Sequence, residues 1–298
     1  MAFSSPEVYL SEGYVKRLLK PADTLNVLQE MPIRTNDFFK NRLTAKSRTA
    51  HGATENYENV APADRISYFD LRVDAVPSRH LNLHVETVQT SATYKTGSIF
   101  KKWKNLRPCY YLPYRRNGTT RMKLSPPAGY AGDDILFFAT ATIDGCSVYV
   151  EGPQGTPKVT HTNAQRISPA PTGAETDLAK QARIANKITD MDRRMNIIKK
   201  GVTTVVERPD YIADYAPGQV AMKQQFATRM GLPLNQVAGY QPFGAVVGVC
   251  SGGNWTFYLQ KNGQFDYKPT PTSADKSAYM VLSVSEFWPT NTGGFRTF

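Results

Sequence analysis

The sequence predicts an α+β fold, in which an antiparallel β-sandwich core carries an N-terminal wrap and a helical insertion. Two observations lead to this prediction. Apolar and polar residues approximate alternation in several short segments from Ser67 onward, as in half-buried strands. After that point, helical spacing of apolar residues occurs instead at about residues 174–230. With 298 residues, 41% hydrophobic and 20% charged, the chain can bury a core of this kind.

Residues 1–65 are predicted to form an N-terminal wrap and a flexible leader. A short helix over Asp23–Glu30 ends before Pro32, because proline cannot continue a helix. Residues 46–65 are polar and lack a period, which indicates a loop or linker. Residues 66–298 then form a β-rich domain that contains the candidate catalytic residues.

Strands are predicted where alternating segments are bounded by turn residues. The turn Gly-Pro-Gln-Gly-Thr-Pro at residues 152–157 predicts a hairpin. Further turns are predicted at Ser251–Asn254 and Asn262–Gly263. The predicted strands are 67–76, 81–88, Pro108–Pro113, Ile135–Ile143, Ser147–Glu151, Lys158–Thr162, Gly244–Cys250, Trp255–Gln260, Phe265–Lys268 and Tyr279–Val284.

Two helices are predicted in the insertion. Thr172 and Glu175 have the spacing of a capping box, so a long helix is predicted from there to Gly201. A shorter helix is predicted from near Gly218 to Met230, with Gly231 as its C-terminal cap. Apolar residues recur every three or four positions in the long helix and are expected to face the core. They are Leu178, Ala182, Ala185, Ile188, Met191, Met195 and Ile198.

The predicted hairpin places a cysteine and a histidine on adjacent strands. Cys146 precedes the first strand and His161 lies near the end of the second, so the two side chains can approach each other. A neighbouring imidazole accepts the thiol proton and stabilises the nucleophilic thiolate. Gly145 allows close approach of a substrate, and backbone N–H groups near Cys146 can stabilise an oxyanion. The alternative is that Cys146 is a small buried hydrophobic residue and His161 caps a surface turn.

The segment 135–164 resembles the cysteine-hydrolase fold of the cytotoxic necrotizing factor toxins, the Burkholderia lethal factor toxin and the chemoreceptor glutamine deamidases. The resemblance rests on Gly145-Cys146 at a strand start and His161-Thr162 on the return strand. It implies deamidation of a protein glutamine, with Cys146 as nucleophile and His161 as base and then acid. It also implies that Thr140, six residues before Cys146, orients the histidine, with Thr142 as the alternative.

This chain departs from the family pattern at one position beside the nucleophile. The family motif usually has Leu-Ser-Gly-Cys, whereas this chain has Ile143-Asp144-Gly145-Cys146. A carboxylate at position 144 favours the neutral thiol, because two negative charges repel each other. Asp144 is therefore expected to raise the pKa of Cys146 unless it is oriented toward His161.

A basic aromatic block occupies residues 99–123. No acidic residue occurs between Glu86 and Asp133, and the whole chain carries a net charge of +11. Trp103, Arg115 and Arg116 are the candidate substrate-binding residues of this block, beside Gly145. Such a mixture suits an acidic protein surface, or single-stranded nucleic acid as the less favoured partner. The third interpretation is a strand-loop-strand segment whose aromatic side chains face the core.

Several classes of protein are not indicated by the sequence. Cys109, Cys146 and Cys250 lie far apart, which argues against a disulfide framework and a zinc site. Phosphate-binding loops, dinucleotide-binding fingerprints and metalloprotease motifs do not occur, so no cofactor and no metal are expected. The chain shows no transmembrane pattern and no classical signal peptide. We therefore expect export by a dedicated route and action in a host cytosol, or else a cytoplasmic protein.

Together these features predict a cysteine amidohydrolase that deamidates glutamine or asparagine side chains of a target protein, as a bacterial toxin or effector. The expected partner is a host protein with an acidic or polar surface. One alternative is a non-enzymatic module that binds an acidic protein or nucleic acid through residues 99–123. A second is a cysteine protease or transglutaminase, which would share the nucleophile and differ in substrate or acyl acceptor.

Overall fold

The computed structural model describes eleven segments of the chain. They are residues 16–35, 54–56, 66–73, 81–86, 107–114, 118–125, 136–163, 175–195, 203–213, 216–291 and 293–297.

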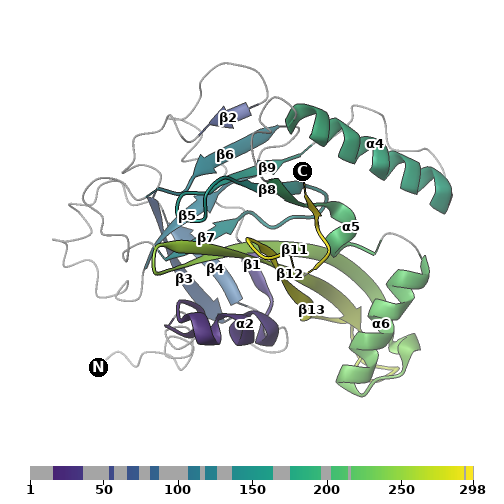
Figure 1. Cartoon of the computed structure of the whole chain (residues 1–298). Helices are drawn as coiled ribbons and strands as arrows, with labels where there is room; N and C mark the ends of the chain where they lie inside the picture. Colours follow the sequence, from purple (N-terminus) through teal and green to yellow (C-terminus); the bar gives the residue numbers. More distant parts are fainter. Residues whose placement is uncertain are drawn as a thin grey trace, which may run out of the picture.

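Two sheets face each other in the described part of the chain (Figure 1). Most neighbouring strands are antiparallel, and the parallel pairs are β1–β4, β2–β6 and β5–β7. The predicted α+β fold with a β-sandwich is confirmed. The larger sheet has the order β1 (Ile33–Thr35), β4 (Leu81–Glu86), β3 (Ile66–Val73), β5 (Arg107–Leu112), β7 (Phe137–Thr140), β11 (Val237–Ser251), β12 (Asn254–Tyr267) and β13 (Lys276–Trp288). The smaller sheet has the order β14 (Arg296–Thr297), β10 (Thr203–Val206), β8 (Ser147–Glu151), β9 (Lys158–Thr162), β6 (Thr119–Lys123) and β2 (Thr54–Asn56).

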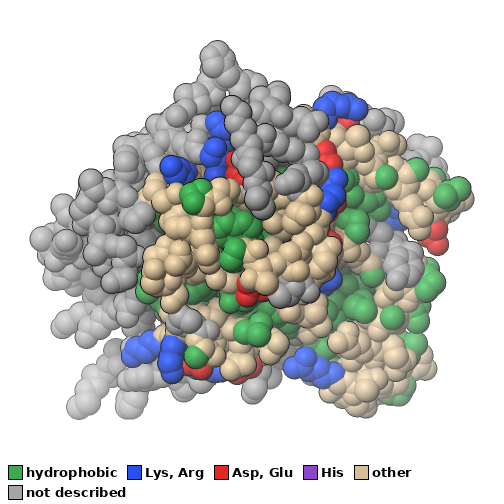
Figure 2. Space-filling view, viewed as in Figure 1, with side chains coloured by type: hydrophobic (Ala, Val, Ile, Leu, Met, Phe, Trp, Pro, Cys, Tyr) green, Lys and Arg blue, Asp and Glu red, His purple; other side chains and the backbone are tan. Residues whose placement is uncertain are grey.

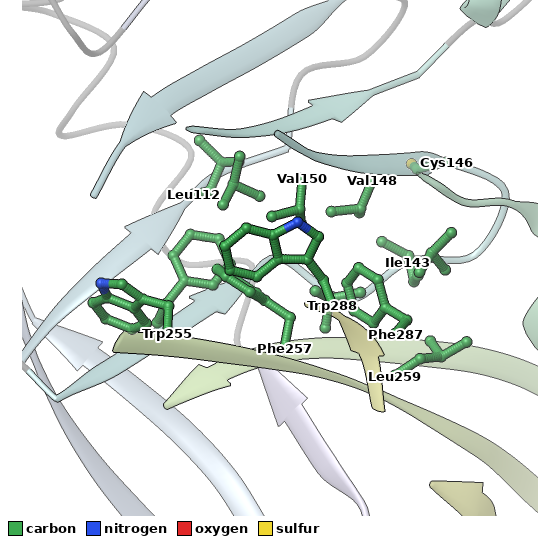
Figure 3. Packing of buried hydrophobic residues seen from close by; sticks show 14 of the residues in the cluster. Leu112, Ile143, Cys146, Val148, Val150, Trp255, Phe257, Leu259, Phe287 and Trp288 are labelled. Atoms are coloured by element: carbon green, nitrogen blue, oxygen red, sulfur yellow. The ribbon is translucent and has the colours of Figure 1, made fainter. Parts of the chain in front are cut away.

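The main core fills the space between the two sheets (Figure 3). The larger sheet contributes rings such as Phe257 and Trp288, and the smaller sheet contributes β-branched residues such as Val148 and Val150. Successive side chains of β5 point to opposite faces of the larger sheet, so they pack in two different cores. Tyr110 and Leu112 lie in this inter-sheet core, whereas Cys109 and Tyr111 lie in a second core on the opposite face.

The second core is covered by the N-terminal helix α2 (Pro21–Glu30), as expected for a wrap. A buried glutamine on β12 fastens this segment. The side-chain amide of Gln260 donates hydrogen bonds to the carbonyl oxygens of Leu28 (2.6 Å) and Met31 (2.9 Å). Its Oε1 accepts from the backbone N–H of Ile33 (2.7 Å) and from Nδ2 of Asn262 (2.9 Å). These bonds satisfy the helix end and the strand that follows it.

The long predicted helix is present as α4 (Asp177–Met195), but its buried face differs from the prediction. Ile184 and Met191 are buried, whereas Leu178 is 78% exposed. Burial along α4 begins at Ile184, so the regular apolar spacing of the turns before it does not mark a core face. At the start of the helix, Thr176 Oγ1 accepts a hydrogen bond from the Ala179 N–H (3.2 Å). The predicted cap Thr172 lies outside the described residues.

The second predicted helix is α6 (Ala216–Met230), and its predicted glycine cap is confirmed. Gly231 has φ +66°, and the N–H of Leu232 bonds to the carbonyl of Ala227 at 2.8 Å, as in a Schellman motif. α6 packs on the far ends of β11, β12 and β13, away from the inter-sheet core (Figure 1). Phe226 stacks on Phe265 there, with ring centroids 4.4 Å apart. A short 3-10 turn, η5 (Leu234–Gln236), leads from α6 into β11.

Two sequence-based predictions about the strands are wrong. The predicted turn at Asn262–Gly263 lies in the middle of β12, where Asn262 pairs with Phe243 and Val281. The glycine is needed for packing and not for a turn, because a Cβ on Gly263 would lie 2.6 Å from the ring of Phe265. The predicted linker 46–65 contains β2, which extends the smaller sheet by pairing with β6.

Candidate active site

Cys146 lies where the chain crosses from the larger sheet to the smaller one. The backbone of Ile143 exchanges two hydrogen bonds with that of Gly244 in β11, and β8 begins at Ser147. Cys146 is fully buried in the inter-sheet core, close to Ile143 and Val148 (Figure 3). The hydroxyl of Tyr211, on the short helix α5 (Arg208–Tyr211), donates a hydrogen bond to the carbonyl of Cys146 (2.7 Å). The crossing is thus held from both sheets and from α5.

The β8–β9 hairpin has the predicted strand bounds, and its register sets which residues meet. Val148 pairs with His161, and Ser147 pairs with Thr162. Continuing the register puts Asn163 opposite Cys146, with His161 at the diagonal position on the same face. The side-chain amide of Asn163 donates a hydrogen bond to Sγ of Cys146 at 3.3 Å. The hairpin therefore brings Cys146 and His161 to one face, but the hydrogen bond to sulfur comes from Asn163.

His161 is a buried imidazole without hydrogen bonds. It is 1% exposed, and neither ring nitrogen has a hydrogen-bond partner among the described residues. The ring of Tyr114 packs against it, with centroids 5.9 Å apart. Burial lowers the pKa of His161 to about 4, because the charged form loses its hydration. His161 is therefore neutral at physiological pH.

The Cys146 thiol is protonated in this arrangement. Its pKa is raised to about 12, chiefly by burial and in part by the carboxylate of Asp144, as the sequence predicted. The Asn163 amide and the Lys187 ammonium act in the opposite direction, since both favour the thiolate. A thiol with such a pKa needs a base that removes its proton before it can act as a nucleophile.

Gly145 lies beneath two cationic side chains from the helical insertion. Its φ is +151°, and a Cβ at this position would lie 2.9 Å from Nη1 of Arg208 and 3.1 Å from Nζ of Lys187. Arg208 Nη1 also donates to the carbonyl oxygen of Asp144 at 2.9 Å. The helices α4 and α5 therefore place two positive groups beside the residue that precedes Cys146.

Helix α4 is fastened beside this site by its second half. Oδ1 of Asp192 accepts hydrogen bonds from the hydroxyl of Tyr149 in β8 (3.0 Å) and from Arg296 Nη2 (2.8 Å). Arg296 also bonds to Glu207, next to α5. These contacts join α4 and the start of α5 to β8 and β14 of the smaller sheet, which fixes the side of the site from which Lys187 extends.

The remaining predicted site residues do not join this group in the described residues. Thr140 is buried at the end of β7 and donates its hydroxyl to the carbonyl of Ala141 (2.8 Å), so it does not orient His161 by a hydrogen bond. Trp103, Arg115 and Arg116 lie outside the described residues. Tyr110 and Tyr111 of the basic aromatic block are buried in the two cores, as its third interpretation expected. On the face shown in Figure 2, described Lys and Arg side chains form several separate groups.

Sequence reasoning missed four residues around the cysteine: Asn163, Lys187, Arg208 and Tyr211. The position of Asn163 could have been found by counting the register outward from the 152–157 turn. Lys187, Arg208 and Tyr211 are on helices separated from Cys146 by 41 or more positions in the sequence, and no local pattern marks them.

The described residues contain no group of three or more histidine, cysteine, aspartate or glutamate side chains placed to hold a metal ion. Among the helices of the described residues, none has the length and apolar composition required to cross a membrane.

Comparisons with known proteins give a weak structural similarity and no sequence match. No protein-family model and no curated protein matches the chain. Among solved structures, the chain is similar to the C-terminal domain of CNFy from Yersinia pseudotuberculosis, with a TM-score of 0.34 and 8% sequence identity. The alignment covers 94% of this chain and 98% of that chain. Because the similarity is weak, the function proposed below depends on the chain's own residues.

Proposed function

We propose that the chain is a cysteine amidohydrolase that deamidates glutamine or asparagine side chains of a target protein. The observation that supports this most is that the His161 side chain is buried and makes no hydrogen bond to any described residue. A fully buried imidazole with no hydrogen-bond partner among the described residues is costly for a purely structural residue. His161 lies on the same face of the β8–β9 hairpin as Cys146, and a neutral imidazole there can take up the thiol proton.

In the proposed reaction, His161 accepts the proton of Cys146 and the thiolate adds to the carboxamide carbon. His161 then returns the proton to the leaving nitrogen, so that the C–N bond breaks and ammonia departs from a thioester. Water, deprotonated by His161, adds to the thioester carbon, and the C–S bond breaks. His161 returns the proton taken from water to the departing thiolate. The products are the restored thiol, ammonia and a carboxylic acid, which ionises by giving its proton to the ammonia.

Gly145 and Asn163 have further roles in the proposed reaction. Gly145 has no Cβ, which leaves its backbone open to a flat carboxamide once the two cations above it move. Asn163 orients Sγ at the start of the reaction by its hydrogen bond. Sγ must exchange this contact for one with His161 when the substrate binds, and catalytic hydrogen bonds commonly tighten at that stage.

We further propose that the chain acts as a bacterial toxin or effector on a host protein, and that it is exported without a classical signal peptide. The basis is the resemblance of residues 135–164 to the two toxin groups among the cysteine hydrolases named above. Metal and cofactor are not required by this mechanism.

The test is a mass-spectrometric search for deamidation in a host-cell lysate treated with the wild-type chain, Cys146→Ser or His161→Gln. We expect target peptides heavier by about 1 Da at glutamine or asparagine only with wild type, because conversion of an amide to an acid changes the mass by that amount. Cleaved backbones would instead identify a protease, and incorporated amines a transglutaminase. Equal deamidation by wild type and Cys146→Ser would overturn the proposal.

A further inference from the structure

Two cationic side chains converge on Gly145, the residue before the proposed nucleophile. Nη1 of Arg208 and Nζ of Lys187 lie 2.9 and 3.1 Å from the position that a Cβ would occupy. Arg208 belongs to α5 and Lys187 to α4, so the two charges arrive from separate elements. Fold elements that bring like charges together at one point need a compensating negative charge.

Lys187 lacks that compensation among the described residues. No described carboxylate forms an ion pair with its ammonium within 4 Å, and no described group accepts a hydrogen bond from it. It is nevertheless half-buried, and burial lowers its pKa, with Arg208 and Arg183 acting in the same direction. Cys146 and Asp144 are the groups that act against this shift. A partly desolvated ammonium beside a guanidinium is the arrangement expected of a site that binds an anion.

The local charges indicate which anion fits. Lys187 and Arg208 contribute two positive charges, and the nearby exposed Asp144 contributes one negative charge. Arg183, which also acts on Lys187, is paired with Glu175 and is left out of the balance. The balance is one positive charge, which matches a monoanion such as a carboxylate better than a phosphate dianion. Since the site adjoins Cys146, an anion bound there lies beside any group that the thiolate attacks.

We propose that Lys187 and Arg208 bind a carboxylate of the protein substrate, so that the chain selects a target carboxamide with an acidic residue beside it. This inference rests on the proposed function, because it takes Cys146 as the nucleophile. The contacts with Gly145 are made by the ends of two flexible side chains and not by backbone. A bound carboxylate draws those ends toward itself and uncovers Gly145 for the carboxamide.

The test compares alkylation of Cys146 by iodoacetate, which is an anion, with alkylation by neutral iodoacetamide. The measured quantity is the ratio of the two rate constants, read by mass spectrometry of the Cys146 peptide. In Lys187→Met we expect this ratio to fall about fivefold, since one of the two attracting charges is lost. Lys180→Met, which removes the same charge from the same helix, should change the ratio less than twofold. Lys187→Arg should keep the wild-type ratio.

A ratio that is equal in wild type and Lys187→Met would overturn the carboxylate site. Equal slowing of both reagents would also overturn it, because it would mean that Lys187 acts only on the thiolate. As a second measurement, N-acetylglutamate should raise the Tm of wild type more than N-acetylglutamine does. This difference should be absent in Lys187→Met, and its absence from wild type would count against the site even if Cys146 alkylates slowly.

These readings are independent of deamidation. A charge-selective alkylation that depends on Lys187, in a chain that deamidates nothing, would retain the carboxylate site and reject the proposed function. Deamidation with no preference for acidic neighbours, together with an alkylation ratio that is the same in wild type and Lys187→Met, would retain the proposed function and reject the carboxylate site.

Discussion

The side-chain amide of Asn163 donates a 3.3 Å hydrogen bond to Sγ of Cys146 across the mouth of the β8–β9 hairpin, and both side chains are buried. A donor aimed at sulfur stabilises the thiolate more than the thiol. In a site where burial raises the pKa of Cys146 to about 12, this contact is the strongest of the influences that lower it.

Replacement of Asn163 by alanine should therefore raise the pKa of Cys146. A hydrogen bond to a charged group contributes about 1.5 kcal/mol, so alkylation at a fixed pH should slow about tenfold. The measurement is the rate of iodoacetamide labelling against pH, which separates thiol ionisation from accessibility. A pH profile that keeps its midpoint in Asn163→Ala would show that the contact with sulfur has no electrostatic role.

His161 should make the folded chain sensitive to mild acid. Its pKa is about 4 in the fold against 6.5 for an ordinary histidine, so between these values only the unfolded chain takes up the proton. Stability is then complete above pH 6.5 and is lost as the pH falls to 4, by about 3 kcal/mol in total. Urea unfolding at pH 7.5 and pH 4.5 should show a smaller loss for His161→Gln than for wild type. Parallel losses in the two proteins would contradict the prediction.

Alanine at position 145 should destabilise the fold through its backbone. A φ of +151° is rarely adopted by residues with a Cβ, and the cost is about 2 kcal/mol. The contacts with Arg208 and Lys187 add little, because the ends of those side chains can move. Gly155→Ala is the matched control, since its Cβ would meet only the carbonyl oxygen of Gly253 at 3.4 Å. Equal thermal stability of the two variants would show that Gly145 tolerates a side chain.

Gln260→Leu should loosen the N-terminal segment. It leaves the buried backbone groups of Leu28, Met31 and Ile33 without the partner they have in the native fold. Unpaired buried groups cost about 1–3 kcal/mol each, and the total loss should be about 4 kcal/mol. Gln264→Leu on the same strand is the control. Urea unfolding measures the loss, and limited proteolysis near α2 should precede global unfolding in Gln260→Leu alone.

The hairpin around residues 152–157 shows what the sequence can predict about this fold. Its strands have the predicted bounds, because a strong turn signal lies between two segments of apolar and β-branched residues. The turn predicted at Asn262–Gly263 fails for the opposite reason. Its two residues are turn formers by local preference, but tertiary contacts decide their conformation: Asn262 bonds to Gln260, and Gly263 makes room for rings.

The site shows the same limit. Cys146, Gly145 and His161 lie in or next to one hairpin, so their proximity could be predicted from the pairing of its two strands. Lys187 and Arg208 come from helices that follow the hairpin, and their approach to Gly145 depends on how α4 and α5 dock. Leu178 illustrates the difficulty, because its helical spacing predicts burial and it is exposed. The spacing of apolar residues shows which side of a helix can be buried, but not how many of its turns are covered by other elements.

Because the small core under α6 is separate from the inter-sheet core, the two parts of the molecule differ in their stability against local unfolding. Phe226 packs on Phe265 and Tyr267 at the far ends of the long strands, with no share in the inter-sheet core. That end can therefore open by itself while the crossing at Ile143–Cys146 remains closed. In native-state hydrogen exchange, amides of α6 and of residues 264–267 should exchange as one early group, ahead of Val148 and Val150 in β8. The chain can thus vary or fray at that end without disturbing the thiol.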